Sequence, residues 1–409
     1  MSSFGIKKIN GGVCAPAGFV ANGVHCGVHK NRGKKDIAII LSETECTAAA
    51  VYTQNKVYGA PITVTRQNIA DGKAKAVICN SGNANTGNAD GIEKAQMMCD
   101  MTAKALGIKP TDIIVASTGV IGQSLNIEPI DKGIKMLADI LSVEGAADAA
   151  VAIMTTDTKV KEVAYSCEIG GKTVTLGAIA KGSGMIHPNM ATMLCFMTSD
   201  ANITSEMLQA ALSEVVTDSF NMVSVDGDTS TNDMVSIMAN GTAGNDIIDS
   251  KGAAFDAFKA MLMMASVELS RKIAGDGEGA TKLLECVVNG APSKKLAIDI
   301  SKSVIASSLV KSMIFGEDAN CGRILCAVGY TEGDFLVDEI DAFMKSAAGE
   351  IKVCADGVVM SFDEELAMKV LHEGEITIRV EMKQGEGSAT AWGCDLTYDY
   401  VKINGDYRT

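Results

Sequence analysis

The stretch Lys181-Gly182-Ser183-Gly184-Met185-Ile186-His187-Pro188-Asn189-Met190-Ala191-Thr192-Met193-Leu194 runs from a glycine-rich polar turn directly into an apolar, strand-like segment. Thr192 stands at the junction, just after the small residue Ala191. A threonine hydroxyl is a poor nucleophile unless a base lies beside it. Cleavage of the Ala191–Thr192 bond would supply that base, because a freed α-amine titrates near neutral pH. The stretch therefore predicts a self-processed enzyme with a terminal threonine nucleophile.

The residues around this junction have alternative roles. Lys181 precedes a flexible Gly-Ser-Gly segment and is suited to hold a substrate carboxylate. His187 is an alternative base, but a lone histidine before a proline is more often a packed or turn residue. Cys195 lies three residues beyond Thr192 and would face the opposite side of a strand, so we expect it in the core.

Composition and charge exclude several classes of protein. The chain has 409 residues, which favours two or three structural units over one simple core. Its formal net charge of −14 repels phosphate backbones and anionic membrane surfaces, so we expect neither nucleic-acid nor membrane binding. There is no run of about 18 apolar residues that could span a bilayer, and no signal peptide follows Lys7 and Lys8. We expect a cytoplasmic protein.

The 12 cysteines are irregularly spaced, without a C-x-x-C pair. Cys26 and His29 lack the second correctly spaced pair that a zinc finger needs. We therefore predict reduced, mostly buried thiols and no metal site.

Apolar periodicity predicts a mixed α/β core in the first two thirds of the chain. Short β-branched or apolar runs predict strands at Asp36–Leu41, Ala76–Cys79, Asp112–Ala116 and Val174–Ala180. Helical spacing predicts helices at Gly91–Leu106, Ile130–Leu141, Glu206–Val216 and Ala253–Ile273. Either Thr204 or Ser205 can cap the third of these helices.

A turn-forming cluster at Asn289-Gly290-Ala291-Pro292 precedes a change of pattern. Beyond it we predict helices at Ser303–Phe315 and Glu364–His372, and strands at Ile324–Tyr330, Glu375–Met382 and Ala389–Val401. The segment 384–387 between the last two strands is predicted to be a hairpin loop. These elements predict a catalytic domain at residues 1–284 and a smaller C-terminal α/β domain at 285–409.

Three further polar loops are candidates for chemistry. Ser117–Gly122 follows an apolar strand, and its small residues would let backbone N–H groups approach a developing negative charge; the alternative is a plain turn. Asp226–Asp233 resembles a calcium loop, but it lacks glycine at the sixth position and has Ile237 instead of glutamate at the twelfth. We expect that loop to border the site.

The third loop, Gly275–Lys282, has three alternating glycines. It follows a predicted helix and precedes a predicted strand, which is the reverse of a dinucleotide-binding loop. Glu278 in this loop is better interpreted as a carboxylate aimed at an amine or a transferring proton.

Taken together, these stretches resemble the glutamate N-acetyltransferase (ornithine acetyltransferase) family of arginine biosynthesis. The resemblance covers essentially the whole chain and rests on the motifs at 80–85, 117–122, 181–194, 224–233, 277–282, 392–396 and 404–409. The motif around Ala191–Thr192 is highly specific, and it agrees with the other motifs in order and spacing.

The resemblance implies cleavage before Thr192, giving an α chain of residues 1–191 and a β chain of residues 192–409. It implies an acetyl-enzyme on Thr192, with Thr118 and Gly119 as the oxyanion hole. It also implies substrate contacts from Thr155, Lys181, Thr192, Glu278, Asn404 and Thr409. The implied fold is an α/β/β/α sandwich of the self-processing aminopeptidase type with a smaller C-terminal α/β domain.

The implied reaction moves an acetyl group from N-acetylornithine to glutamate, with no cofactor. The sequence leaves open whether acetyl-CoA is a further donor, which would make the enzyme bifunctional. The implied assembly is a heterotetramer of two α and two β chains. Two alternative interpretations of the function remain open from the sequence. One is an amidohydrolase or aminopeptidase that uses the same terminal threonine and passes the acyl group to water. The other is a binding protein without catalysis.

Overall fold

The computed structural model describes residues 4–187 and 193–406. Ala191, Thr192 and Thr409 lie outside the described residues. The chain forms two compact units: the first holds 1–182, 188–220 and 229–269, and the second holds 183–187, 221–228 and 270–409. The predicted boundary at residue 285 falls inside a strand, and residues 270–284 group with the C-terminal part.

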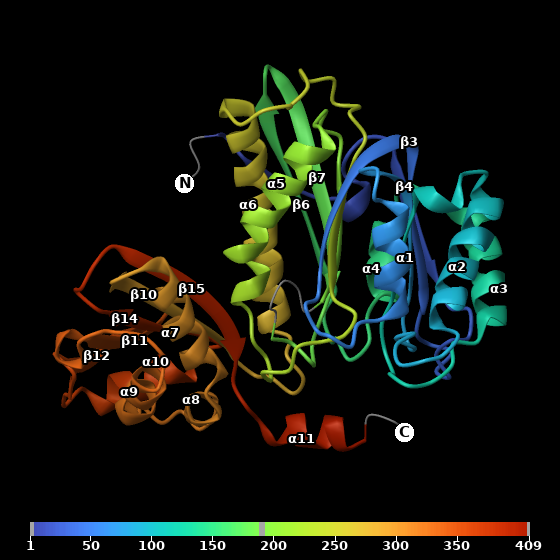
Figure 1. Cartoon of the computed structure of the whole chain (residues 1–409). Coiled ribbons are helices and arrows are strands. Elements are labelled where there is room, and N and C mark those ends of the chain that lie inside the picture. Colours follow the sequence, from blue (N-terminus) through green and yellow to red (C-terminus); the bar gives the residue numbers. More distant parts are fainter. Residues whose placement is uncertain (1–3, 188–192, 407–409) are drawn as a thin grey trace. The chain divides into compact units, whose positions relative to one another are not determined.

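The first unit is built on a nine-stranded sheet with the order β1-β6-β7-β8-β9-β3-β4-β5, with β2 paired to β3 (Figure 1). Its strands are β1 (Lys7–Ile9), β2 (Phe19–Val24), β3 (Ile37–Tyr52), β4 (Lys73–Asn80), β5 (Ile113–Ser117), β6 (Lys161–Ile169), β7 (Lys172–Lys181), β8 (Leu194–Ser199) and β9 (Met234–Ala239). Its helices are α1 (Ala60–Asn68), α2 (Gly91–Leu106), α3 (Ile127–Ile140), α4 (Ala146–Ala152), α5 (Ser205–Thr217) and most of α6 (Ala253–Ala274).

Two apolar clusters show how this sheet is layered. One cluster joins the inner faces of two halves of the sheet, with Ala38 and Ile40 of β3 on one side and Phe196 of β8 on the other. The second cluster packs the outer face of β3, β4 and β5 against α1, α2 and α3. Figure 1 shows α5 and α6 on the other outer side, beside β6 and β7. The predicted α/β/β/α sandwich is confirmed, and β3 belongs to both halves.

The register places four strand ends in one row. Lys181 pairs with Leu194, Leu194 with Met234, and Met234 with Tyr52. The N-terminal ends of β8 and β9 therefore lie beside the C-terminal ends of β7 and β3. This row is the sheet end nearest in sequence to Thr192.

The second unit contains a six-stranded mixed sheet with the order β13-β12-β11-β14-β10-β15. Its strands are β10 (Leu283–Ala291), β11 (Asp341–Ser346), β12 (Gly349–Ala355), β13 (Val358–Val359), β14 (Glu375–Glu381) and β15 (Gly387–Cys394). Its helices are α7 (Lys294–Ala306), α8 (Ser308–Phe315), α9 (Cys321–Gly329), α10 (Glu364–His372) and α11 (Tyr398–Gly405).

Two predicted elements of the second unit were wrong in type or extent. The predicted strand Ile324–Tyr330 is helix α9, capped by the Asn320 side chain, because a short apolar run does not by itself distinguish a strand from a buried helix. The predicted helix Ser303–Phe315 is divided at Ser307, whose backbone is extended and whose hydroxyl accepts the Val310 N–H.

The end of the chain was also predicted incorrectly. The predicted strand Ala389–Val401 ends at Cys394, and α11 follows it. The predicted hairpin is absent, because β14 and β15 each pair with β10, one parallel and the other antiparallel. Local turn residues could not reveal that β10 lies between them.

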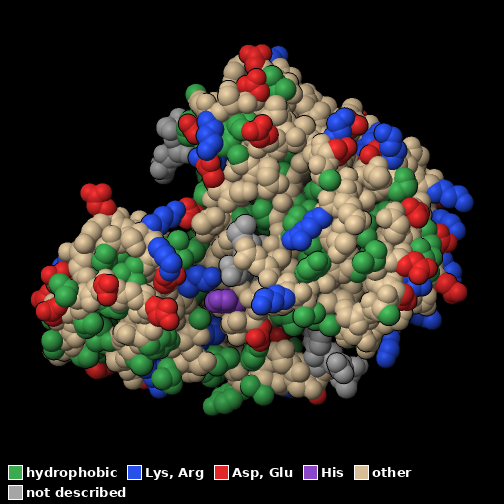
Figure 2. All heavy atoms as spheres, in the orientation of Figure 1, with side chains coloured by type: hydrophobic (Ala, Val, Ile, Leu, Met, Phe, Trp, Pro, Cys, Tyr) green, Lys and Arg blue, Asp and Glu red, His purple; other side chains and the backbone are tan. Residues whose placement is uncertain are grey.

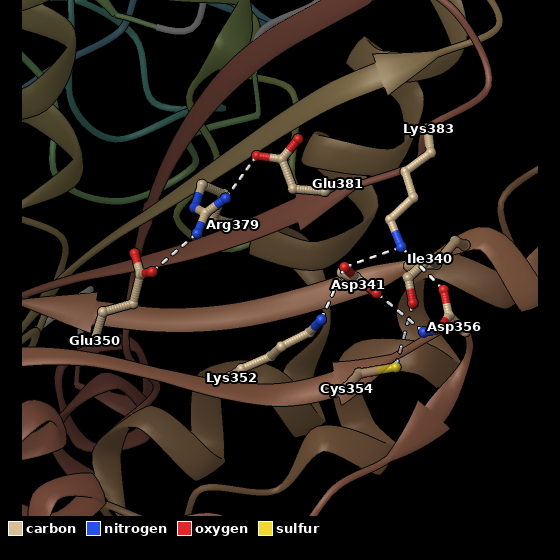
Figure 3. Close-up of polar contacts among 9 residues, drawn as sticks. All are labelled: Ile340, Asp341, Glu350, Lys352, Cys354, Asp356, Arg379, Glu381 and Lys383. Atoms are coloured by element: carbon tan, nitrogen blue, oxygen red, sulfur yellow. Dashed lines mark hydrogen bonds and ion pairs between the residues drawn. The ribbon is translucent and has the colours of Figure 1, made fainter.

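Charged side chains cluster on β11, β12 and β14 of the second unit (Figure 3). The Asp341 carboxylate accepts the Asp356 N–H at 3.0 Å and lies 2.9 Å from Lys352 Nζ and 3.0 Å from Lys383 Nζ. Burial by itself would raise the pKa of Asp341, but the Asp356 N–H and the two ammonium groups lower it to about 2. Asp341 therefore stabilises this sheet as a carboxylate.

Replacing Asp341 by Asn should destabilise the second unit by about 1–3 kcal/mol at pH 7, because the two lysines lose their shared counter-charge. The folded pKa lies below the ordinary value of 3.8, so this stability is present above pH 3.8 and is lost as the pH falls towards about 2. Chemical denaturation at pH 7 and at pH 2–3 would measure both effects. If the free energy of unfolding differed between variant and wild type by the same amount at both pH values, this role of Asp341 would be contradicted.

Candidate active site

The first unit presents Thr118 and Gly119 directly after β5. Their backbone crosses Gly82 and Asn83, and the Thr118 N–H donates to the Asn80 carbonyl at 3.0 Å. Gly119 has φ of 127°, and a Cβ there would lie 2.4 Å from the carbonyl carbon of Gly82. Only glycine fits at this position.

The donors at this turn differ in availability. The Thr118 N–H is already used, whereas the Gly119 N–H and the Thr118 hydroxyl have no acceptor among the residues that the structure describes. An oxyanion hole here would therefore use the Thr118 hydroxyl and the Gly119 N–H.

The strand ends that carry this turn are fixed by side-chain amides. Asn80 Oδ1 accepts the Ser117 hydroxyl at 2.6 Å, and its Nδ2 donates to the Asn83 carbonyl at 3.0 Å. Asn232 donates from Nδ2 to the carbonyls of Ser117 and Ala84 at 2.9 and 2.6 Å. These bonds hold the turn rigid from both sides.

A buried carboxylate, Asp157, connects two of the predicted substrate-binding residues. Its oxygens accept the Thr155 N–H at 3.0 Å and the Gly182 N–H at 2.7 Å, and contact Lys161 Nζ at 2.7 Å. Burial alone would raise the pKa of Asp157, but Lys181, Lys161 and the Gly182 N–H outweigh it and lower the pKa to about 2. Asp157 is therefore ionised and positions both Thr155 and the end of β7 that carries Lys181.

A second buried carboxyl group, Asp233, immediately precedes β9. Its Oδ2 has no hydrogen-bond partner in the described part of the chain, and the residue is buried. Burial raises the pKa of Asp233 well above its ordinary value, although Ser230 and the charge of Lys181 act in the opposite direction. The row of strand ends thus holds, near Lys181, one acid whose pKa is lowered and one whose pKa is raised.

The second unit contains Glu278 and Asn404. Asn404 Nδ2 donates to Glu278 Oε2 at 2.7 Å, and the Glu278 N–H donates to the Ser183 carbonyl at 3.1 Å. A Cβ on Gly184 would lie 2.3 Å from the Glu278 carboxyl carbon, so the glycine is needed for this close approach. The two predicted substrate-binding residues of this unit are therefore in direct contact.

The loop at Asp226 has a structural role in the second unit. The Asp226 carboxylate accepts the N–H groups of Met185 and Ile186 at 2.6 and 2.8 Å, and thus holds the Ser183–His187 segment. His187 Nδ1 lies 2.9 Å from the Ser224 hydroxyl. Burial and the charge of Lys302 lower the pKa of His187 to about 4, despite Asp226, which makes it a weak base at neutral pH.

The remaining predictions concern the cysteines, the cleavage junction and the absence of a membrane-spanning segment. Cys195 is fully buried, as predicted, and all 12 cysteines are free thiols. Thr192, Ala191 and Thr409 lie outside the described residues, so their roles stay predictions. In the described part of the chain, no helix has the length and apolar character needed to cross a bilayer.

Comparison with known proteins decides the family. The ArgJ family model matches residues 20–409. The chain belongs to the ArgJ family. An ArgJ relative, the arginine biosynthesis bifunctional protein ArgJ of Caldanaerobacter subterraneus subsp. tengcongensis, is 50% identical over 405 residues, which is 99% of this chain and 100% of that protein.

Two solved structures are also similar to part of the chain. The arginine biosynthesis bifunctional protein ArgJ of Bacillus halodurans is 42% identical, covers 46% of this chain and 100% of its own, and has a TM-score of 0.44. The ornithine acetyltransferase of Mycobacterium tuberculosis, solved in complex with ornithine, is 34% identical over 46% of this chain and 100% of its own, with a TM-score of 0.42.

Two acidic residues of the candidate site, Asp157 and Asp233, were not predicted from the sequence. Asp157 had a detectable signal, because Asp157 and Lys161 are an acid and a base four residues apart between a helix and a strand. Asp233 closes the loop 226–233, which the sequence predicts to border the site without assigning a role to Asp233. Neither pattern reveals burial, which is what gives these carboxyl groups their properties.

Replacing Asp157 by Asn should lower kcat/KM for acetyl transfer at least about tenfold, because Lys181 and Thr155 lose their shared anion. Steady-state kinetics at several substrate concentrations would measure this effect, with circular dichroism to confirm folding. Asp200→Asn is the matched control, since Asp200 is also buried and accepts the Thr175 N–H at 2.6 Å, at the opposite end of β7. Equal losses of activity in the two variants would contradict the positioning role.

Proposed function

We propose that this chain transfers the acetyl group of N2-acetyl-L-ornithine to L-glutamate, giving L-ornithine and N-acetyl-L-glutamate. The observation that carries the proposal is the match to the ArgJ family over residues 20–409, together with a 50% identical relative named for arginine biosynthesis. The rigid, glycine-requiring turn at Thr118–Gly119 and the anchored Lys181 support the same chemistry.

The proposed reaction begins with chain cleavage. The Thr192 hydroxyl attacks the Ala191 carbonyl carbon and the peptide nitrogen leaves as the α-amine of Thr192. Water then hydrolyses the resulting ester, which regenerates the hydroxyl. The products are an α chain of residues 1–191 and a β chain of residues 192–409, and the new amine is the base that activates the nucleophile.

Acetyl transfer then takes place in two steps. The Thr192 hydroxyl forms a C–O bond to the acetyl carbon of N-acetylornithine, the C–N bond breaks, and ornithine leaves with the proton. The amine of glutamate next attacks the acetyl ester and returns a proton to the threonine oxygen. In each step the Thr118 hydroxyl and the Gly119 N–H stabilise the tetrahedral oxyanion, and loss of one such donor costs about 3–4 kcal/mol in other enzymes.

We assign substrate binding to residues that offer different chemistry. Lys181 would hold the α-carboxylate that both substrates share, with the Thr155 segment fixed beside it through Asp157. Glu278 would accept the proton of the incoming amine, and its bond to Asn404 orients the carboxylate for that role. Thr409 is proposed as a further substrate contact.

The proposal extends to the second donor, the assembly and the compartment. Acetyl-CoA is proposed as an alternative acetyl donor, with no bound cofactor required. The assembly proposed is a heterotetramer of two α and two β chains.

A cytoplasmic location is consistent with 12 free thiols, because disulfides are rare in that reducing compartment. On the visible face in Figure 2, Lys and Arg side chains are interspersed with Asp and Glu side chains.

Replacing Thr192 by Ala should give one species near 42.6 kDa in denaturing mass spectrometry and no acetyl transfer, whereas the unchanged chain should give two fragments. Thr192→Ser is the control, because it retains a hydroxyl nucleophile and should still be cleaved. A cleaved or active Thr192→Ala variant would refute the nucleophile assignment.

A second measurement separates the transferase from a hydrolase. The wild-type protein is incubated with N-acetylornithine, with and without glutamate, and released ornithine is quantified. We expect ornithine release to depend on glutamate after the first turnover. Equal rates of ornithine release with and without glutamate would indicate an amidohydrolase and contradict the transferase proposal.

A further inference from the structure

A groove lies on the first unit between α1 and α5, over the second half of β3. It consists of two hollows of about 470 and 390 Å³ that share Ala50, Tyr52, Arg66 and Gln209. Their volumes fall in the range of small-molecule sites. None of the residues that line the groove has a role in the proposed acetyl transfer from N-acetylornithine.

The floor of the groove is an unpaired strand edge. Beyond Thr47, β3 pairs with β9 on one side only. The Ala48 N–H donates to the Gly72 carbonyl and the Ala50 N–H to Gln209 Oε1, whereas the Tyr52 N–H has no acceptor among the residues described. Alternation along an antiparallel strand turns the Tyr52 peptide group towards the groove, since the next N–H, that of Thr53, donates to Asp233 in the other direction. Such an edge binds extended chains that carry amide groups.

One end of the groove is cationic. The Arg66 guanidinium carbon lies 4.7 Å from the centre of the Tyr52 ring and 5.5 Å from that of Tyr58, which holds the side chain in place. Within residues 4–187 and 193–406, neither Arg66 nor Lys56 has a carboxylate partner. In a chain of net charge −14 these two free cations are suited to phosphate groups. The acidic side chains Asp71 and Glu206 line only the other hollow, so an anion would bind near Lys56.

The cationic end of the groove borders the row of strand ends that forms the candidate site. Thr53 lines this hollow, and its N–H donates to the Asp233 carbonyl at 3.0 Å while its hydroxyl donates to the Ser230 carbonyl at 2.8 Å. The Asn55 side chain, in the same hollow, donates to the Thr229 carbonyl at 2.9 Å. A ligand in the groove would therefore lie next to the segment that ends at Asp233.

We propose that this groove binds acetyl-CoA, with the phosphates on Lys56 and Arg66 and an amide of the pantetheine arm on the free edge of β3. The inference rests on the proposed function, in which acetyl-CoA is the second donor. In the resulting step the thioester C–S bond breaks, a C–O bond forms to the hydroxyl nucleophile, and the hydroxyl proton leaves on the CoA thiol. The acetyl ester is the same as that formed from N-acetylornithine.

The test compares two double variants with the same loss of charge. Lys56→Ala/Arg66→Ala removes the cations of the groove, and Arg32→Ala/Lys104→Ala removes two exposed cations of the same unit outside it. We expect the groove variant to raise KM for acetyl-CoA at least about tenfold, measured by thiol release at fixed glutamate. Its transfer rate from N-acetylornithine to glutamate should be unchanged, and the control should leave both reactions unchanged.

A direct probe tests the phosphate contacts. Adenosine 3′,5′-bisphosphate should inhibit the wild-type acetyl-CoA reaction competitively without inhibiting transfer from N-acetylornithine. The inference is overturned if the two double variants raise KM equally, if the groove variant lowers both activities alike, or if the wild type does not use acetyl-CoA. Absence of N-acetylornithine transfer in the wild type would instead refute the proposed function.

Discussion

The hydrogen bonding of one long strand, β3, is the constraint on which this structure depends. Its first half pairs with β2 and β4, and its second half pairs with β9, so the same strand belongs to both layers of the sandwich. The apolar faces of the two halves then pack against each other, which removes a large apolar area from water. This arrangement leaves one edge of β3 unpaired beyond the end of its pairing with β4. The inferred groove lies along that edge.

The same pairing places the end of β7 that carries Lys181 in one row with the ends of β8, β9 and β3. Lys181, Leu194, Met234 and Tyr52 follow one another across four strands, although they are far apart in sequence. Buried charge then fixes the details. Asp157 is ionised because two lysines and two backbone N–H groups surround it. These partners offset part of the free energy that burial of an isolated carboxylate would cost. Asp233 has a carboxylate oxygen without a hydrogen-bond partner among the residues described, and burial raises the pKa of its carboxyl group.

Much of the first unit could be predicted from periodicity, because its elements are long and strongly patterned. The predicted helix Gly91–Leu106 has the same bounds as α2, with Gly107 in the left-handed conformation after it. The errors are concentrated in the second unit, where short apolar runs do not distinguish a helix from a strand. Ile324–Tyr330 became α9 because Asn320 caps a helix there and because its apolar residues pack among other helices. The order β14-β10-β15 depends on pairing between distant strands, which turn residues do not encode.

The sequence by itself determined the chemistry that this chain can offer. It located the junction Ala191–Thr192, the turn Thr118–Gly119, Lys181 and Glu278, because nucleophiles, small residues and charges are properties of residue type and order. Only the tertiary structure decided which of these groups touch and in what state of charge they stand. The contact of Asn404 with Glu278, the ionised Asp157 and the raised pKa of Asp233 all arise from burial and from pairing between segments far apart in the chain. Those properties depend on distance and desolvation, and neither can be read from residue order.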